Sequence, residues 1–269
     1  AEDVAVGPIE KAGAGELVIS STISGLADAI QIDAGTVRIT GAGTEVVQNA
    51  YTGSYKNPYW PWKDGTLIVE DGAKLTVGCK LFDQDWSNAD VTYRQISVKN
   101  GATLEFSGTE AFLGSYENGG KAGNSFDNGK KQAYLSVDAS TLILPSSTFT
   151  VGNRMQSLST RYAQLSIANG STVTGAKLIV GNRASGNGDY LIVDGSSVTL
   201  TDGIYLDPNN SDWSQAGMLF KNSTVTLKKL SANLSKTNKS NNRSVKFDGA
   251  TFVPTEASAS FFAVPLPLV

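Results

Sequence analysis

Short segments in which hydrophobic and polar residues alternate recur along the whole chain. Leu191, Val193 and Val198, for example, fall on one face of an extended chain, and Ile192 and Thr199 fall on the other. A period of two residues predicts β-strands. Val, Ile, Leu, Phe and Thr dominate these segments and favour strands. The sequence therefore predicts an all-β protein.

The alternating segments are copies of one unit. Each copy is a strand, then an Asp or Asn followed by small residues, and then a second strand. The copies begin near residues 30, 67, 96, 135, 165, 191, 218 and 245, at intervals of 26 to 39 residues. In seven of them the Asp or Asn lies four residues before the next apolar anchor, and the Asn222 copy is one residue shorter. A recurring unit of this size indicates a stacked solenoid.

The copies favour a parallel stack over a series of antiparallel hairpins. Asp-Gly also closes two-residue hairpins, but here three residues separate the Asp or Asn from the next anchor, and the copies match one another closely. Stacked copies place like residues about 4.8 Å apart. The predicted inward ladder comprises Leu67, Ile96, Leu135, Leu165, Leu191 and Met218. The Asp and Asn residues are expected at one corner, where alternate Asn relieves repulsion and the side chains cap turns rather than bind a row of calcium ions.

A known repeat family resembles the start of this chain. The segment Lys11-Ala-Gly-Ala-Gly-Glu-Leu-Val-Ile-Ser20, followed by residues 30–41, resembles the autotransporter-associated β-strand repeat. That family has Gly-x-Gly-x-Leu-x-Leu-Ser, a spacer, a strand and Gly-Thr-Leu. The match is good over residues 11–41, and degenerate copies extend it to about residue 253. The resemblance implies a right-handed parallel β-helix that is exported to a Gram-negative cell surface, and it implies no catalytic residues.

The ends of a solenoid must protect its first and last strands from edge pairing. We expect residues 1–29 to form an N-terminal cap and first repeat strand, and residues 30–253 to form a β-helix of about eight coils. Residues 254–269, an apolar segment that contains prolines, are expected to form a C-terminal cap or tail.

Composition excludes several classes of function. The net charge of −3 provides no basic surface for nucleic acid. The chain contains no histidine, the commonest general base and metal ligand, and Cys79 is its single cysteine. No segment has the length and apolarity of a membrane span. The sequence predicts no cofactor, no metal site and no catalytic residues, and therefore no enzyme.

The predicted insertions all fall at the same point of the repeat, between the end of one copy and the start of the next. They are therefore expected on one side of the stack. They are residues 44–64, 79–94, 109–133, 153–163, 182–189, 207–217 and 235–243, and they hold all four tryptophans. The predicted ligand-binding residues are Tyr55, Tyr59, Trp60, Trp62, Trp86, Arg94, Arg154 and Arg183. Aromatic rings offer platforms for sugars, and arginine binds carboxylate or sulfate groups. The alternative is that the rings pack the insertions onto the rod, with arginine stacked on them.

The predicted function is that of an exported, cell-surface β-helical scaffold or adhesin-like module. Its expected partner is a polysaccharide or a host or cell-surface glycan, and its expected location is extracellular or on the bacterial outer surface. One alternative is a polysaccharide lyase or hydrolase of β-helix type, which needs a base or paired carboxylates. The acids available in the insertions are Asp83, Asp85, Asp90, Glu110, Glu117 and Asp127, and no spacing singles out a pair. The other alternative is a purely structural stalk.

Overall fold

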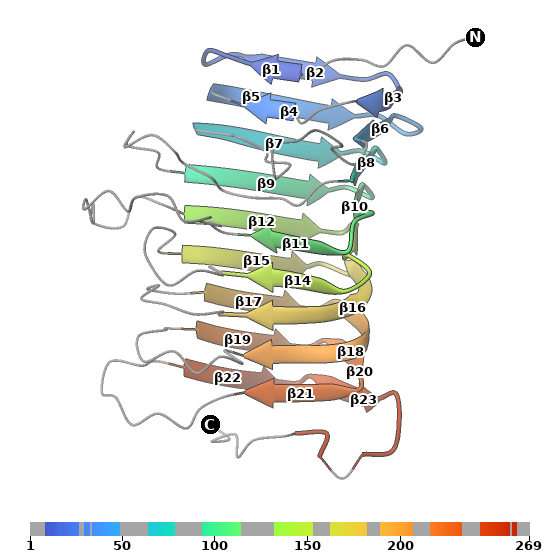
Figure 1. Ribbon diagram of the computed structural model, residues 1–269, viewed down its shortest axis with the longest axis vertical. Coiled ribbons are helices and arrows are strands. Elements are labelled where there is room, and N and C mark those ends of the chain that lie inside the picture. Colours follow the sequence, from blue (N-terminus) through green and yellow to red (C-terminus); the bar gives the residue numbers. More distant parts are fainter. Residues whose placement is uncertain are drawn as a thin grey trace.

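The computed structural model describes residues 9–26, 30–32, 34–48, 64–78, 93–113, 132–152, 162–181, 189–206, 216–232, 243–258 and 260–262. Within these ranges the chain is all-β and contains no helix. No helix in the described ranges could therefore cross a bilayer. Parallel strands stack coil upon coil into a solenoid, which confirms the predicted fold (Figure 1).

One face of the solenoid is a nine-stranded parallel sheet, called here the back sheet. Its strands, from the N-terminal end, are β2 (Glu16–Ile19), β5 (Ala34–Thr40), β7 (Asp64–Glu70), β9 (Tyr93–Lys99), β12 (Gln132–Asp138), β15 (Tyr162–Ala168), β17 (Asp189–Asp194), β19 (Ala216–Lys221) and β22 (Arg243–Asp248). Each strand pairs with the corresponding strand of the next coil, as the stacked repeat predicts.

A twelve-stranded sheet forms the rest of the wall. The side face consists of β3 (Ile23–Leu26), β6 (Glu45–Gln48), β8 (Lys74–Val77), β10 (Thr103–Phe106), β13 (Thr141–Ile143), β20 (Thr224–Leu227), β23 (Thr251–Pro254) and the first halves of β16 (Thr172–Val180) and β18 (Ser197–Leu206). The front face consists of β11 (Glu110–Leu113), β14 (Thr148–Val151), β21 (Lys229–Ala232) and the second halves of β16 and β18. A register shift between Gly175 and Lys177 marks the bend from one face to the other. At the N-terminal end, β1 (Ile9–Lys11) pairs with β4 (Ile30–Ile32).

The coils wind in a right-handed sense. In Figure 1, β9 and β12 run from left to right at the back, and β16 and β18 return from right to left at the front. Successive coils descend from the N-terminal end. This winding agrees with the handedness of nearly all connections between parallel strands.

The predicted inward ladder lies at the centre of the solenoid. Leu135 pairs with Leu165, Leu165 pairs with Leu191, and all three side chains are buried. Burial of each such side chain contributes roughly 1.5–3 kcal/mol to folding. Ile192 and Thr199 face outward, as the alternation predicts.

The first copy is displaced from its predicted register. The sequence repeat aligns Ile30 with Leu67, whereas the backbone partner of Leu67 is Val37. Ile30 instead pairs with Ile9 in the separate two-stranded sheet. Val37 and Ile39 provide the buried positions of β5, so a second alternating segment seven residues later takes the place predicted for the first. The parallel stack also includes β2, which pairs with β5 before the first predicted copy.

From β7 onward, the corner that follows the back sheet contains two kinds of turn. Three turns have two successive residues with positive φ: Asp71-Gly72, Asn100-Gly101 and Asn169-Gly170. Four turns have one such residue: Ala139, Gly195, Asn222 and Gly249. Positive φ is the conformation that Gly, Asn and Asp tolerate best, which explains all of these residue types except Ala139.

The sequence pattern places every Asp and Asn of the repeat at the same position of the turn, and for some copies this prediction is wrong by one residue. Asp138 pairs with Lys99 and Asp194 pairs with Lys221, so these aspartates end their strands and precede the turn residues by one position. Two residues separate β12 from β13, whereas three separate β9 from β10, so the shorter turns shift the aspartate. Asn and Asp side chains of neighbouring coils nevertheless bond each other. The Asn100 amide donates to Asp71 (3.1 Å), and the Asn169 amide donates to Asp138 (2.6 Å).

The predicted insertions share one phase, although two begin later than expected. Every connection of eight or more residues between two strands ends at the start of a back-sheet strand, and these starts lie along one edge of that sheet, at the left in Figure 1. The insertions predicted at 44–64 and 109–133 begin too early. β6 and β11 occupy their first residues and pair in register with neighbouring coils.

Aromatic side chains close the C-terminal end of the stack. Phe220 and Phe247 stack with ring centroids 6.0 Å apart, and Phe252 lies edge-on to both. The chain then folds back, so that the Leu230 N–H donates to the Phe261 carbonyl (2.9 Å) and Leu230 forms a parallel bridge with Phe262. This part of the tail covers the last front strand.

Candidate functional site

Most of the predicted ligand-binding residues lie outside the described ranges. These are Tyr55, Tyr59, Trp60, Trp62, Trp86, Arg154 and Arg183. The eighth, Arg94, lies in β9, where its backbone pairs with Ala133, and its side chain is outside the description. The aromatic and arginine platform therefore stays a prediction. Of the acids considered for catalysis, Glu110 alone falls in a described range, in β11.

The back sheet presents a row of outward side chains close to the edge where its strands begin. One residue per coil contributes: Thr66, Gln95, Tyr134, Gln164, Tyr190, Gly217 and Ser244. We call this set the neutral row, because none of its members carries a charge. Tyr134, Gln164 and Tyr190 are partly exposed. Sequence reasoning missed these tyrosines because it searched the insertions, whereas they are the outward members of the alternating strands.

The edge of the Tyr190 ring lies over the backbone of the next coil. A Cβ atom added to Gly217, the backbone partner of Tyr190, would lie 2.9 and 3.0 Å from two ring carbons. Only glycine leaves room for the ring at this distance. Gly217 is buried beneath it. An aromatic side chain laid over a glycine of the neighbouring strand stabilises the pairing of strands, and it also holds the ring low on the sheet surface.

A second outward row, of serines, runs beside the neutral row. Ser97, Ser136 and Ser166 pair in register on successive coils and are partly exposed. The Gln164 side-chain amide donates to the Ser166 hydroxyl (2.7 Å), which fixes the orientation of the amide. The middle of the back sheet therefore carries neutral hydrogen-bonding groups and aromatic rings.

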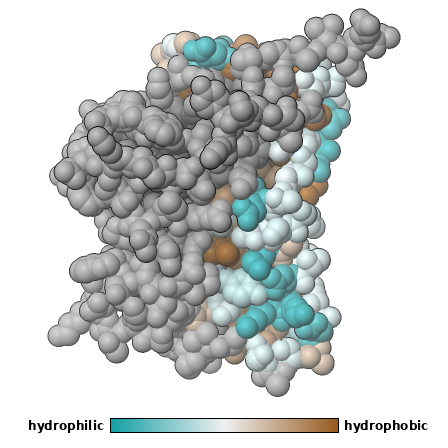
Figure 2. Space-filling view, in the orientation of Figure 1, coloured by the Kyte–Doolittle hydropathy of each residue, from teal (hydrophilic) through white to brown (hydrophobic). Residues whose placement is uncertain are grey.

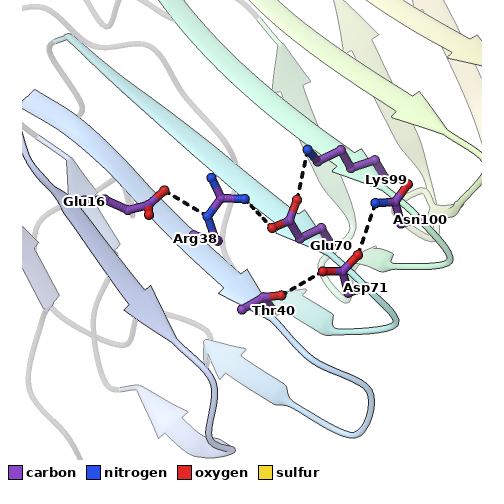
Figure 3. Close-up of polar contacts among 7 residues, drawn as sticks. All are labelled: Glu16, Arg38, Thr40, Glu70, Asp71, Lys99 and Asn100. Atoms are coloured by element: carbon purple, nitrogen blue, oxygen red, sulfur yellow. Dashed lines mark hydrogen bonds and ion pairs between the residues drawn. The ribbon is translucent and has the colours of Figure 1, made fainter.

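Charged residues of the back sheet alternate in sign from coil to coil. Arg38 lies between Glu16 (2.8 Å) and Glu70, and Lys99 bonds the second oxygen of Glu70 (2.9 Å) (Figure 3). Only 9% of the Glu70 side chain is exposed. Burial raises the pKa of this carboxyl, but the hydrogen bonds from Lys99 and Arg38 outweigh burial and hold the pKa below its ordinary value.

Similar cross-coil pairs occur on the other faces. On the side face, Lys74 lies between Glu45 (3.4 Å) and Glu105 (2.9 Å). Where the side face meets the front face, Asp202 pairs with Lys177 (3.0 Å) and accepts a hydrogen bond from the Tyr205 hydroxyl (2.9 Å). Burial and this hydrogen bond raise the pKa of Tyr205 to about 12.

The arrangement of these charges suits a structural role. The described carboxylates of Glu70, Glu105 and Asp202 each bond a lysine or arginine of a neighbouring coil, so they specify register. Paired opposite charges on adjacent strands contribute to sheet stability. Among the described residues, no group of three or more Cys, Asp or Glu side chains is placed to hold a metal ion. Figure 2 shows that the described surface toward the viewer is mostly pale or teal, with brown atoms in scattered groups.

Comparison with known proteins provides no relative. No protein-family model matches this chain, and neither a curated protein nor a solved structure matches it.

Proposed function

We propose that this protein is an exported β-solenoid scaffold of adhesin type, which displays a row of inserted segments along one side of a rigid rod. The carrying observation is that the long connections between strands all occupy the same place in the coil. Each connection of eight or more residues ends at the start of a back-sheet strand, while the pairing of the coils continues in register. A scaffold of this kind holds its insertions at a fixed spacing of about 4.8 Å per coil, or multiples of it.

The proposed partner is a polysaccharide or a host or cell-surface glycan, bound by aromatic and arginine side chains of the insertions. Trp60 and Trp62, with Tyr55 and Tyr59 nearby in sequence, form the densest aromatic segment of the chain. Aromatic rings stack on the apolar faces of sugars, and two prolines in this segment restrict the backbone and reduce the entropy lost on binding.

A glycan array tests this proposal. Wild-type protein is expected to bind a defined group of glycans, and the double variant Trp60→Ala/Trp62→Ala is expected to lose that binding. Phe262→Ala is the control, because it removes a ring that is 48% exposed at the C-terminal end of the stack and does not belong to a predicted insertion. Binding that survives the double variant would overturn the aromatic platform. Absence of binding to every glycan would favour the structural stalk.

Two further measurements separate the remaining alternatives. Release of reducing or unsaturated ends from neutral and acidic glycans, abolished by Asp85→Ala, would support the lyase or hydrolase. Labelling of intact, unpermeabilised cells by an antibody against the chain tests the proposed location on the bacterial outer surface. Labelling that requires permeabilised cells would contradict it.

A further inference from the structure

The neutral row places aromatic and amide side chains at regular intervals along the solenoid axis. Gln95, Tyr134, Gln164 and Tyr190 are consecutive backbone partners, one from each coil. Because parallel strands lie about 4.8 Å apart, Tyr134 and Tyr190, two coils apart, are separated by about 10 Å along the axis. The row is therefore a repeating surface in which rings alternate with amides.

We propose that the neutral row binds a straight, uncharged β-1,4-linked polysaccharide that lies along the solenoid axis. An extended chain of this kind advances nearly the same distance per sugar as the solenoid does per coil. Each sugar is turned over relative to the next, so every second ring presents the same face. Two tyrosines separated by two coils match that repeat, and the intervening Gln164 faces the intervening sugar.

The position of the Tyr190 ring suits stacking on a sugar. Gly217 lets the ring edge lie over the next coil, close to the sheet. Tyr190 remains partly exposed. The C–H groups on the face of a β-linked pyranose carry partial positive charge, and an aromatic face is negative, so the two attract each other. A ring held low on the sheet is ordered before the ligand arrives, which reduces the entropy cost of binding.

The amides provide the polar contacts that a sugar requires. Gln164 donates one N–H to Ser166, and this bond directs the rest of the amide. An amide offers a carbonyl acceptor and two N–H donors, so Gln164 and Gln95 can bond hydroxyl groups on both sides of Tyr134. A few placed polar groups beside aromatic rings are typical of small-molecule and sugar sites.

The absence of charge in the neutral row selects the class of glycan. From Thr66 to Ser244 the row contains no acidic or basic side chain. Glu70 and Lys99 lie four residues beyond the row in their strands and pair with each other, and Lys246 lies two residues beyond Ser244 in the last coil. An uncharged polysaccharide fits this surface, whereas an acidic one would find no cation in the row. This site lies on the coils themselves, so it goes beyond the insertions of the proposed function.

Calorimetric titration with cellohexaose tests the proposal, and maltohexaose, whose α-1,4 chain curves, is the matched control ligand. The wild-type chain is expected to bind cellohexaose and not maltohexaose, with affinity that rises from cellobiose to cellotetraose as the ligand reaches both tyrosines. Sodium chloride is expected to leave the affinity unchanged, because no charge takes part. Equal binding of the two hexaoses, or no binding of cellohexaose at millimolar concentration, would overturn the proposal.

Variants locate the binding surface. Tyr190→Ala and Tyr134→Ala are each expected to weaken cellohexaose binding about ten-fold. Tyr190→Phe keeps the ring and should bind like the wild type, as should Tyr205→Phe at the boundary of the side and front faces. Circular dichroism melts confirm that each variant is folded. Unchanged affinity in a folded Tyr190→Ala variant refutes the assignment. Loss in Trp60→Ala/Trp62→Ala but not in Tyr190→Ala would also refute it, while supporting the insertions as the site.

Discussion

The inward ladder predicts a large cost for shortening one of its central members. Leu165 is fully buried, and its backbone pairs with Leu135 in the preceding coil and Leu191 in the following coil. Replacing a buried leucine by alanine costs about 2–5 kcal/mol, and the cost depends on how far the surroundings can collapse. Here both neighbours are held by backbone pairing in two coils, so little collapse is possible. We expect Leu165→Ala to lower the free energy of unfolding by about 3–5 kcal/mol.

Urea unfolding followed by circular dichroism measures this loss. Leu219→Ala is the matched control, because it is the same substitution in the same sheet at an outward position that is only partly buried. The control is expected to cost about 1 kcal/mol or less. Because coils of a solenoid are stabilised by their neighbours, the effect of Leu165→Ala reaches two interfaces at once. Equal losses in the two variants would show that Leu165 does not belong to a packed inward ladder, and the reasoning from coil stacking would fail.

Three further predictions follow from side chains and turns. Glu70 has a lowered pKa in the folded chain, so its contribution to stability is present above its ordinary pKa of 4.5 and lost as the pH falls through the lowered value. Glu70→Gln should therefore flatten the decline of melting temperature between about pH 5 and pH 3, and a decline as steep as in the wild type would contradict the ion pairs. Tyr205 has a pKa raised from 10.0 to about 12, so the stability it contributes is lost as the pH rises through that range. The melting temperature of Tyr205→Phe should therefore fall less than that of the wild type over this pH range. Identical dependence of the two melting temperatures on alkaline pH would exclude the Asp202 hydrogen bond. Ala139 has a φ of 47°, so Ala139→Gly should stabilise the chain by about 0.5–1 kcal/mol in urea unfolding. A destabilised variant would indicate that the turn has another conformation.

The sequence predicts the stacked fold because the signal recurs in every coil. Leu135, Leu165 and Leu191 each lie in an alternating strand of similar length, and the structure pairs them directly. The register of the turns could not be predicted in the same way. Asp138 ends a strand and Asn100 begins a turn, yet both precede small residues and an apolar anchor at equal spacing. Because Asp or Asn can stand either at the end of a strand or at the start of a turn, the sequence pattern does not reveal a difference of one residue in turn length.

The neutral row was not predicted from the sequence, for a related reason. Tyr134 and Tyr190 lie in different copies with Gln164 between them, so the row exists only after the coils are aligned. The alternating pattern does place both tyrosines outward, which is the signal that could have found them. The approach of Tyr190 to Gly217 depends on the pairing of β17 with β19 and the direction of the ring, and neither follows from composition.

Coil length varies greatly without disturbing the alignment of neighbouring strands. Ile96 and Leu135 are 39 residues apart in the chain and Leu165 and Leu191 are 26 apart, yet both are direct backbone partners. The connection that leads into each back-sheet strand absorbs most of the difference. A foreign peptide grafted into such a connection, between residues 181 and 189 for example, would change the length of one coil and leave its neighbours in register. The protein thus offers a molecular ruler on which guest sequences can be mounted at chosen intervals.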